Sequence, residues 1–251
     1  MKISIITVVY NRVDTVREAL QSLQAQTYSC IEHILQDGGS TDGTLNVIAE
    51  QTNNRTYLNS GPDDGIYDAL NQGIARASGD IIGLLHSDDL FANASVIKLV
   101  TATFDEMQVD GVYGDLEYVA KDDPSRVIRY WQAGEYKPEL LRRGWMPPHP
   151  TLFLRREVFE QYGTYDTSFR IAADYDAMLR WFTRGNLKLA YIPQVLVKMR
   201  VGGESNRSIG RILRKTVEDY RALRNNGVGG IGVLTAKNLS KIPQFLKRAA
   251  K

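Results

Sequence analysis

Two adjacent aspartates, Asp88 and Asp89, stand where the apolar run "IIGLL" ends in "HSDDL". Neighbouring carboxylates repel each other unless a cation, a hydrogen-bond donor or water offsets their charge. Mg²⁺ and Mn²⁺ prefer oxygen ligands, and Mg²⁺ is usually held by one or two carboxylates together with substrate phosphates. The pair is therefore either a solvated turn or a site for a divalent cation and a diphosphate.

Three further polar clusters follow apolar runs in the same way. They are "YN" at Tyr10 and Asn11, "DGGSTDG" at 37–43 and "GPDDG" at 61–65. Each cluster alone is explained by the polar turns that commonly end strands. Because the loops at the carboxyl ends of parallel strands meet at one edge of a sheet, the four clusters together predict a common ligand cleft.

The glycine and cysteine patterns disfavour other familiar sites. "DGGSTDGT" matches neither G-x-G-x-x-G nor G-x-x-x-x-G-K-[ST], which disfavours a dinucleotide-binding enzyme and a P-loop kinase. One cysteine, Cys30, and three separated histidines give no zinc-binding pattern. The single cysteine cannot form an internal disulfide, and this favours a reducing compartment.

Alternating strands and helices must position these clusters. Four strand-like apolar runs are each followed by a segment with helical spacing: 2–9 and 13–26, 31–36 and 39–51, 56–60 and 66–77, and 80–85 and 93–107. This alternation predicts an α/β fold with a mostly parallel central sheet and helices on both faces.

The alternation ends near residue 115. "LEYVA" and "VIRYW" flank the polar turn "KDDPSR" and predict a hairpin, while "AADYDAMLRWFTR" has the spacing of another helix. We therefore expect a nucleotide-binding half, 1–115, an acceptor-binding and catalytic half, 116–204, and a basic helical tail, 205–251. The first two are expected to share one sheet within one globular domain.

The composition is that of a soluble globular protein, with 43% hydrophobic and 24% charged residues. The opening apolar run is too short for a signal peptide, and no run reaches the roughly 18 apolar residues that a membrane span needs. We therefore expect a cytoplasmic protein.

The tail concentrates positive charge. It has eleven lysines and arginines against Glu218 and Asp219, a net charge of +9, which leaves −7 for the preceding residues because the whole chain carries +2. Such a tail suits an anionic lipid surface, a phosphorylated acceptor or nucleic acid. A solvated helix face would have the same composition.

Five motifs, in this order and spacing, resemble glycosyltransferase family 2, whose members transfer sugars with inversion and have the A-type glycosyltransferase fold. They are "SIITVVYNR", "LQDGGSTDGT", "DGIYDALNQGIARASGD", "LLHSDD" and "AADYDAMLRW". The resemblance implies metal-dependent transfer of a sugar from a nucleoside-diphosphate sugar, with UDP favoured, to a hydroxyl of an acceptor saccharide. The Q-x-x-R-W segment of polymer-forming members is absent, which favours a single addition.

The resemblance also assigns roles to individual residues. It places six residues around the nucleotide part of the donor: Thr7, Tyr10, Asn11, Asp37, Asp68 and Asp88. Tyr10 would stack on the base, and Asp37 would accept a hydrogen bond from it. Asp89 would be the direct ligand of Mg²⁺ or Mn²⁺, with Asp88 as the partner nearer the ribose or sugar.

The resemblance places the catalytic base at Asp174. An inverting transfer needs a carboxylate within hydrogen-bond reach of the attacking hydroxyl. Many relatives have Glu-Asp at this motif, whereas this chain has Ala173 and Asp174 and a second carboxylate at Asp176. Positions 174 and 176 lie about 200° apart on a helix, so only one should face the cleft. Asp176 stays open as the alternative base.

Several ring side chains have two interpretations. His149 would face the acceptor or diphosphate, or be a structural loop residue, and Trp145 would be an acceptor-sugar platform or a packing residue. His86 is expected beside the metal loop. Trp131 and Trp181 are expected in the core.

The motif variants resemble bacterial enzymes that extend lipid-linked oligosaccharides of surface polysaccharides such as O-antigen. The expected acceptor is a saccharide or such an oligosaccharide, and the tail would contact the inner face of the inner membrane; no nucleic-acid partner is expected. Two other functions remain open, a sugar-1-phosphate nucleotidyltransferase and a non-catalytic sugar-nucleotide-binding scaffold. The first usually has a Gly-rich basic loop that "VVYNRVDT" lacks.

Overall fold

One sheet crosses the whole molecule in the computed structural model, which describes residues 1–202 and 209–240. The strands of these residues lie in the order β3-β2-β1-β4-β8-β6-β9-β5, with β7 paired to β6. They are β1 Ile3–Val9, β2 Ile31–Asp37, β3 Thr56–Ser60, β4 Ile81–Leu84, β5 Asp89–Phe91, β6 Gly111–Val119, β7 Val127–Trp131, β8 Phe153–Arg155 and β9 Leu189–Arg200.

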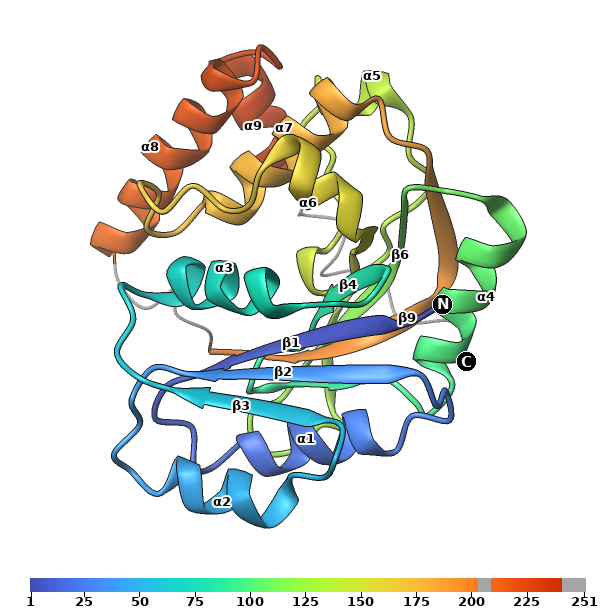
Figure 1. Cartoon of the computed structure of the whole chain (residues 1–251). Coiled ribbons are helices and arrows are strands. Elements are labelled where there is room, and N and C mark those ends of the chain that lie inside the picture. Colours follow the sequence, from blue (N-terminus) through green and yellow to red (C-terminus); the bar gives the residue numbers. More distant parts are fainter. Residues whose placement is uncertain (203–208, 241–251) are drawn as a thin grey trace.

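Helices cover both faces of this sheet (Figure 1). Those of the first part of the chain are α1 Val16–Gln24, α2 Thr44–Gln51, α3 Ile66–Arg76 and α4 Val96–Met107. Those of the second part are α5 Pro138–Leu141, the 3₁₀ turn η1 His149–Thr151, α6 Arg156–Tyr162, α7 Ala173–Gly185, α8 Ile209–Asn225 and α9 Ile231–Leu239. Helices α1, α2 and α4 pack on one face, and α3, α6 and α7 pack on the other.

The strand β1 shows why the sheet is central. All seven of its residues are buried, and neighbouring side chains point to opposite faces. Ile3 and Ile5 join the core beneath α4, whereas Ile6 and Val8 join the core beneath α3 and α7. A strand buried on both faces has a nearly continuous apolar sequence, and this is the pattern of a parallel sheet under two helical layers. β1 pairs in parallel with both β2 and β4.

The second half of the sheet mixes strand directions. β8 runs antiparallel to β4 and β6, β6 runs parallel to β9, and the expected hairpin is present as the antiparallel pair β6 and β7. Strand β9 is missing from the sequence-based expectation because Pro193 and Gln194 interrupt its apolar pattern; there its pairing with β6 shifts register. The expected boundary at residue 115 falls inside β6.

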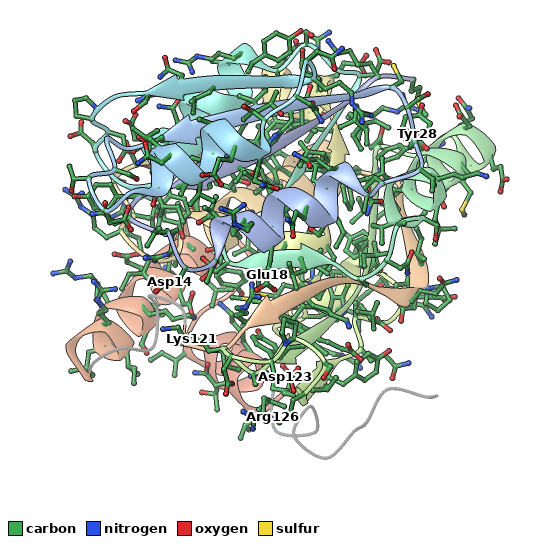
Figure 2. The ribbon with its side chains drawn as sticks, turned by 90° about the horizontal axis from the view of Figure 1, so that it is seen from below. Asp14, Glu18, Tyr28, Lys121, Asp123 and Arg126 are labelled. Carbon is green, nitrogen blue, oxygen red and sulfur yellow. The ribbon has the colours of Figure 1, made fainter. Side chains whose placement is uncertain are left out.

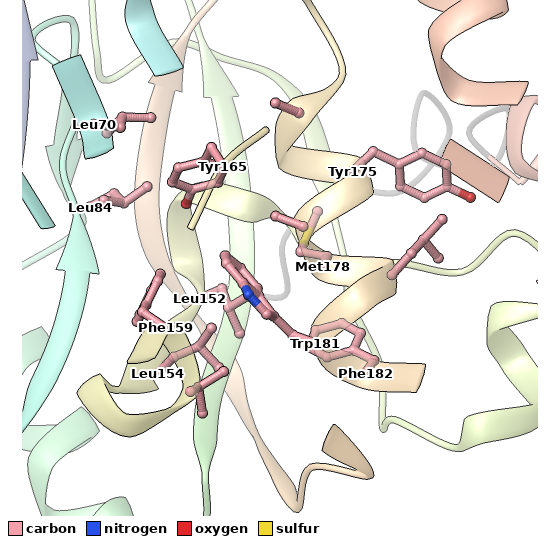
Figure 3. Close-up of a cluster of buried hydrophobic side chains, with 14 of the residues drawn as sticks. Leu70, Leu84, Leu152, Leu154, Phe159, Tyr165, Tyr175, Met178, Trp181 and Phe182 are labelled. Carbon is pink, nitrogen blue, oxygen red and sulfur yellow. The ribbon is translucent and has the colours of Figure 1, made fainter. Parts of the chain in front are cut away.

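Of the two tryptophans expected in the core, Trp181 is fully buried in the core beneath α7 and Trp131 is not. Figure 3 shows Trp181 among buried side chains from α6, α7 and the adjoining strands, and its ring is 1% exposed. Its indole N–H donates to the Gly163 carbonyl at 2.9 Å. Trp131 is only partly buried, at the edge of the core beneath α4.

Two helices of the expected tail, α8 and α9, belong to the folded body. In α8, Ala222 and Leu223 have no exposed surface and pack in the same core as α7. Within residues 1–202 and 209–240, no helix is both long enough and apolar enough to cross a bilayer. The rest of the expected tail, 205–208 and 241–251, lies outside the described residues.

Candidate active site

The loops after β1 and β2 are joined into one structure at the edge of the sheet. Asn11 has a left-handed backbone, with φ of +50°. Its N–H donates to Ser40 Oγ at 2.9 Å, and its Oδ1 accepts the N–H of Thr41 at 2.9 Å. Asn11 therefore organises this loop, and the neighbouring ring of Tyr10 is left 59% exposed.

Both carboxylate oxygens of Asp37 already accept hydrogen bonds from protein groups. It has no exposed surface, and its Oδ2 accepts the N–H groups of Gly39 and Ser40, both at 3.0 Å, and the hydroxyl of Ser60 at 2.6 Å. Its Oδ1 accepts the hydroxyl of Ser40. This arrangement differs from the expected contact between Asp37 and a base, because both oxygens are already committed below the surface.

A different carboxylate lies beside Tyr10. A Cβ atom on Gly38 would come within 2.5 Å of Asp63 Oδ2 and 3.4 Å of Tyr10 Cδ2, so the Asp63 carboxylate fills the space that a side chain at 38 would take. Asp63 Oδ1 accepts the N–H of Gly65 at 2.9 Å, which fixes the carboxylate. The sequence-based assignment did not single out Asp63. Two features of the sequence together could have indicated it: a glycine at 38, which leaves room for another side chain, and two aspartates in "GPDDG".

Thr7, expected beside the donor, is instead inside the sheet. It has no exposed surface, and its Oγ1 lies 3.1 Å from Nε2 of His33. Burial lowers the pKa of His33 to about 3, so the ring is neutral at ordinary pH. Thr7 thus stabilises the pairing of β1 with β2 and offers no atom to a ligand.

Helix α3 links the loop after β3 to the second half of the chain. Asp68 accepts the N–H of Asp64 at 3.1 Å and so closes the turn before the helix. Asn71 Nδ2 donates to the Tyr165 carbonyl at 2.8 Å, and the N–H of Tyr165 donates back to Asn71 Oδ1 at 3.0 Å. Asn71 therefore joins the two halves rather than lying open to a donor.

Asp89 is a buried carboxylate without a hydrogen bond. Its residue is 1% exposed, and within the described part of the chain neither oxygen has a hydrogen-bond partner. Burial, and then the charge of Asp88, raise its pKa well above the usual value of 3.8, an increase that the backbone N–H of Arg200 and then the charge of its guanidinium only partly oppose. Buried unpartnered carboxylates are costly, so this residue needs a cation or a proton.

Arg200, at the end of β9, is hydrogen-bonded to the loop that contains Asp88. It is 4% exposed, and its guanidinium donates to the carbonyl of Asp88 at 3.0 Å, the carbonyl of Lys121 at 3.2 Å and the carboxylate of Glu18 at 2.6 Å. Figure 2 labels Glu18 on α1 and Lys121 after β6. The sequence gives no sign of this role, since β9 itself was not expected.

The acidic pair fits a divalent ion that a ligand helps to hold. Among residues 1–202 and 209–240, no three His, Cys, Asp or Glu side chains are grouped closely enough to form a metal site of their own. Magnesium sites commonly complete one or two carboxylates with water and substrate phosphates. The orphaned oxygens of Asp89, next to Asp88, match this type of site.

Asp174 lies in the first turn of α7, where it meets α3. The hydroxyl of Tyr67 is 3.2 Å from Asp174 Oδ1 and donates to the Ile171 carbonyl at 2.6 Å. Burial lowers the pKa of His86 and of His149, to about 4 for His149. The charges of Asp88 and then Asp174 partly oppose this at His86, and the charge of Asp174 partly opposes it at His149. Both histidines are thus electrostatically connected to Asp174.

The two histidines lie side by side as neutral rings. Their centroids are 6.2 Å apart, and Nε2 of His149 is 2.9 Å from the hydroxyl of Tyr165. His149 is 8% exposed, so its ring is buried and bonded to Tyr165.

Asp176 points to another part of the molecule. It is 4% exposed, Asn226 Nδ2 donates to its Oδ1 at 2.9 Å, and Arg180 Nη1 lies 3.6 Å from its Oδ2. The two carboxylates of α7 therefore have different neighbours, as their angular separation on the helix predicts.

Trp145 packs and also lines a pocket. Its N–H donates to the Ala133 carbonyl at 2.7 Å, and its ring lies 5.7 Å from Tyr113 and 5.3 Å from Tyr136. With Trp131 it borders a pocket of about 120 Å³ next to α9.

The family model for glycosyl transferase family 2 matches residues 4–163. The chain belongs to glycosyltransferase family 2. The resemblance of the five motifs is thereby confirmed, and this family 2 chain is a transferase enzyme.

Two mycobacterial relatives support the assignment. A PGL/p-HBAD biosynthesis glycosyltransferase from Mycobacterium bovis is 32% identical over 208 residues, which are 81% of this chain and 78% of that protein. A Mycobacterium tuberculosis protein described as an uncharacterized glycosyltransferase is 34% identical over 187 residues, 71% of this chain and 68% of that protein.

Solved structures confirm the A-type fold. Residues 1–349 of S. aureus TarS in complex with UDP-GlcNAc superpose with a TM-score of 0.67 at 18% identity, covering 91% of this chain and 66% of that one. A Pyrobaculum calidifontis mannosyltransferase in complex with GDP-Man and Mn²⁺ gives 0.67 at 17% identity, covering 97% and 70%. The family 2 chain spans 39% of a longer TarS chain.

Proposed function

We propose that this family 2 enzyme transfers a single sugar, with inversion and with a divalent metal, from a nucleoside-diphosphate sugar to a hydroxyl of an acceptor saccharide. A UDP-sugar is the favoured donor. The observation that carries the proposal is the unpartnered buried carboxylate of Asp89, which follows β4, together with the exposed ring of Tyr10, which follows the parallel neighbouring strand β1. When bound, the ion would neutralise the charge that the leaving nucleoside diphosphate gains.

Asp174 is the proposed base. The Tyr67 hydroxyl, whose single hydrogen is shared between the Ile171 carbonyl at 2.6 Å and Asp174 Oδ1 at 3.2 Å, lies against Oδ1, so Oδ2 is the oxygen that would take the proton of the acceptor hydroxyl as it attacks the anomeric carbon. Asp176 is engaged by Asn226 and Arg180, which supports the choice of Asp174 between the two. No covalent intermediate is needed, because inversion takes one displacement.

Tyr10 and Asp63 are the residues that we propose to contact the nucleobase of the donor. The planar nucleobase of the donor can stack on the exposed ring of Tyr10. Asp63 Oδ2, beside that ring, would then accept a hydrogen bond from a ring N–H of the nucleobase that is next to a carbonyl group. Uracil and guanine both carry such an N–H, and TarS and the mannosyltransferase are solved with UDP-GlcNAc and GDP-Man. Asp63 would thus have the role that the sequence alone assigns to Asp37.

Thermal unfolding with UDP, GDP and dTDP, each with and without Mn²⁺ or Mg²⁺, tests this function. We expect stabilisation by a nucleotide only when the metal is present, of about 2.7 kcal/mol at a ligand concentration of 100 Kd. The matching nucleotide sugar should then be turned over with an acceptor saccharide. Absence of stabilisation and turnover across the panel would contradict the proposal.

The Asp63 contact is tested by moving its carboxylate. Asp63→Ala should weaken nucleotide binding about tenfold, an effect of the size expected for one charge-assisted hydrogen bond. The exchange Gly38→Asp with Asp63→Gly puts a carboxylate back into the same space and should recover most of the loss, whereas the exposed neighbour Asp64→Ala should bind as the wild type does. Calorimetric titration gives the affinities; an unaffected Asp63→Ala variant would exclude this contact.

A lipid-linked acceptor and contact with an anionic membrane surface complete the proposal. Helix α8 exposes apolar side chains, with Leu213 at 63% and Val217 at 67%, on the segment that carries the excess of basic residues. Apolar side chains flanked by positive charge suit an anionic lipid interface.

Replacing Leu213 and Val217 by glutamate should reduce binding to vesicles that contain anionic lipid. The effect should be largest at low salt, because salt screens the basic residues. Co-sedimentation measures it, with vesicles of neutral lipid as the control. Wild-type binding that is absent, or that does not change with salt, would contradict the contact.

A further inference from the structure

The backbone N–H groups of Arg170, Ile171 and Ala172, just before α7, need hydrogen-bond acceptors, because an unpaired N–H group away from water is costly. Of these, the N–H of Ala172, the N-cap residue, also belongs to the first N–H groups of the helix, which have no partner within it. Residue Ala172 stands at the N-cap of α7, and its side chain cannot cap. Asp174 follows within the first turn, so the position of the proposed base depends on how this segment is held.

A carboxylate from the C-terminal part of the chain holds the segment. Glu218, in α8, accepts the N–H of Arg170 at 3.1 Å on Oε1, and the N–H groups of Ile171 at 2.8 Å and Ala172 at 3.0 Å on Oε2. It is 8% exposed. Hydrogen bonds to a buried charged acceptor are stronger than neutral ones, and a negative charge is favourable at a helix N-terminus.

The opposite side of the same segment is held by α3. Tyr67 donates to the carbonyl of Ile171 at 2.6 Å, and the guanidinium of Arg170 reaches the Asp64 carbonyl at 3.4 Å. The Ile171 residue is therefore bonded from both sides, its N–H to α8 and its C=O to α3. This fixes the backbone immediately before Asp174 between the donor side and the C-terminal helices.

Helix α8 is itself firmly attached. Figure 1 shows it beside α7, and Asn226, just beyond its end, bonds to Asp176 of α7 at 2.9 Å. Asp219 is paired with Lys215 at 2.7 Å and with Lys237 of α9 at 2.9 Å. These contacts make α8 a rigid support, although it lies outside both the five motifs and the residues that the family model matches.

We propose that Glu218 is a positioning residue for Asp174, so that α8 is part of the catalytic unit. The inference rests on the proposed role of Asp174 as base. Glu218 fixes the orientation of the peptide groups of Ile171 and Ala172 through its hydrogen bonds to their N–H groups. These peptide groups in turn orient the first turn of α7, and with it Asp174, toward the acceptor hydroxyl. Small displacements of a reacting group cost as much as 10²-fold in rate, which gives a buried backbone clamp a catalytic consequence.

Glu218→Gln in the full chain tests the proposal. The variant keeps the size of the side chain but removes its charge, and its amide group would oppose an N–H donor. We expect kcat to fall by about 10- to 100-fold while KM for the donor and the affinity for nucleotide with metal change less than about twofold. Arg224→Gln, exposed on the same helix, is the matched control and should behave as the wild type does.

The result distinguishes positioning from general stability. A folded Glu218→Gln variant with wild-type kcat would overturn the proposal, and so would a parallel loss of kcat and nucleotide affinity. If the glutamine variant does not fold, Glu218→Asp, which keeps the charge on a shorter side chain, is measured by the same criteria. If Asp174→Asn itself retains turnover, the assignment of the base fails instead, whatever Glu218→Gln does.

Discussion

Asp174→Asn is expected to lower the turnover of sugar transfer by about 10²- to 10⁴-fold, the usual contribution of a general base, and to leave metal-dependent nucleotide binding nearly unchanged. An amide has the shape of the carboxylate and can keep the contact with Tyr67, but it cannot accept the proton of the acceptor hydroxyl. Donor binding should persist because Tyr10, Asp63 and Asp89, the proposed donor and metal contacts, lie on segments other than α7, which carries Asp174. Steady-state kinetics and calorimetric titration measure the two effects separately.

Asp176→Asn is the matched control, two residues along the same helix. Its carboxylate is buried against Arg180 and Asn226, so the loss should appear as a lower unfolding temperature and not as a large fall in kcat. Breaking a buried hydrogen-bonded contact costs about 1–3 kcal/mol. Near-wild-type turnover by Asp174→Asn, or a catalytic loss confined to a well-folded Asp176→Asn, would show that the base is not Asp174.

The order of elements in the first half of the chain could be predicted because it depends on local patterns. Each apolar run and the helical spacing after it lie next to each other in sequence, and the polar clusters at the strand ends follow from parallel pairing. The placement of Asp88 and Asp89 beyond the end of β4, with Asp89 opening β5, needs little more than this. The fold class therefore followed from the residues themselves.

The missed parts of the site depend on contacts between distant segments. Asp63 fills the space over Gly38 only because β2 and β3 lie side by side. Arg200 reaches the carbonyl of Asp88 across 112 positions of the chain, and Glu218 reaches Ile171 across 47. Neither the spacing of residues nor their local propensities carries this information, since tertiary packing decides it.

Thr7 and Asp37 are the opposite case. Each stands in a motif that predicts a ligand contact, and the structure shows both fully buried and bonded to protein atoms. A polar residue near a strand end can support the loop that forms a site without touching the ligand itself. Burial and the number of hydrogen bonds already made decide between these two roles.

Asp89→Asn is expected to abolish the metal-dependent stabilisation by nucleotide and most of the activity, yet to make the metal-free protein more stable. The wild type buries a carboxylate that has no hydrogen bond and lies beside the charge of Asp88. Removing an uncompensated buried charge gains stability, on the order of 1–3 kcal/mol or more. Asp88→Asn, at a more exposed carboxylate, should give a smaller gain.

The gain from Asp89→Asn should depend on pH in a definite direction. Because the pKa of Asp89 is raised above 3.8, the folded protein retains a proton that the unfolded chain has already lost, so wild-type stability falls as pH rises between the two values. The Asn variant lacks this group, and its advantage in unfolding temperature should grow over the same range. Adding Mn²⁺ with the nucleotide should remove the advantage, because only the wild type binds the ion. A variant no more stable than the metal-free wild type at any pH would show that the burial of Asp89 is not what prepares the site for its ion.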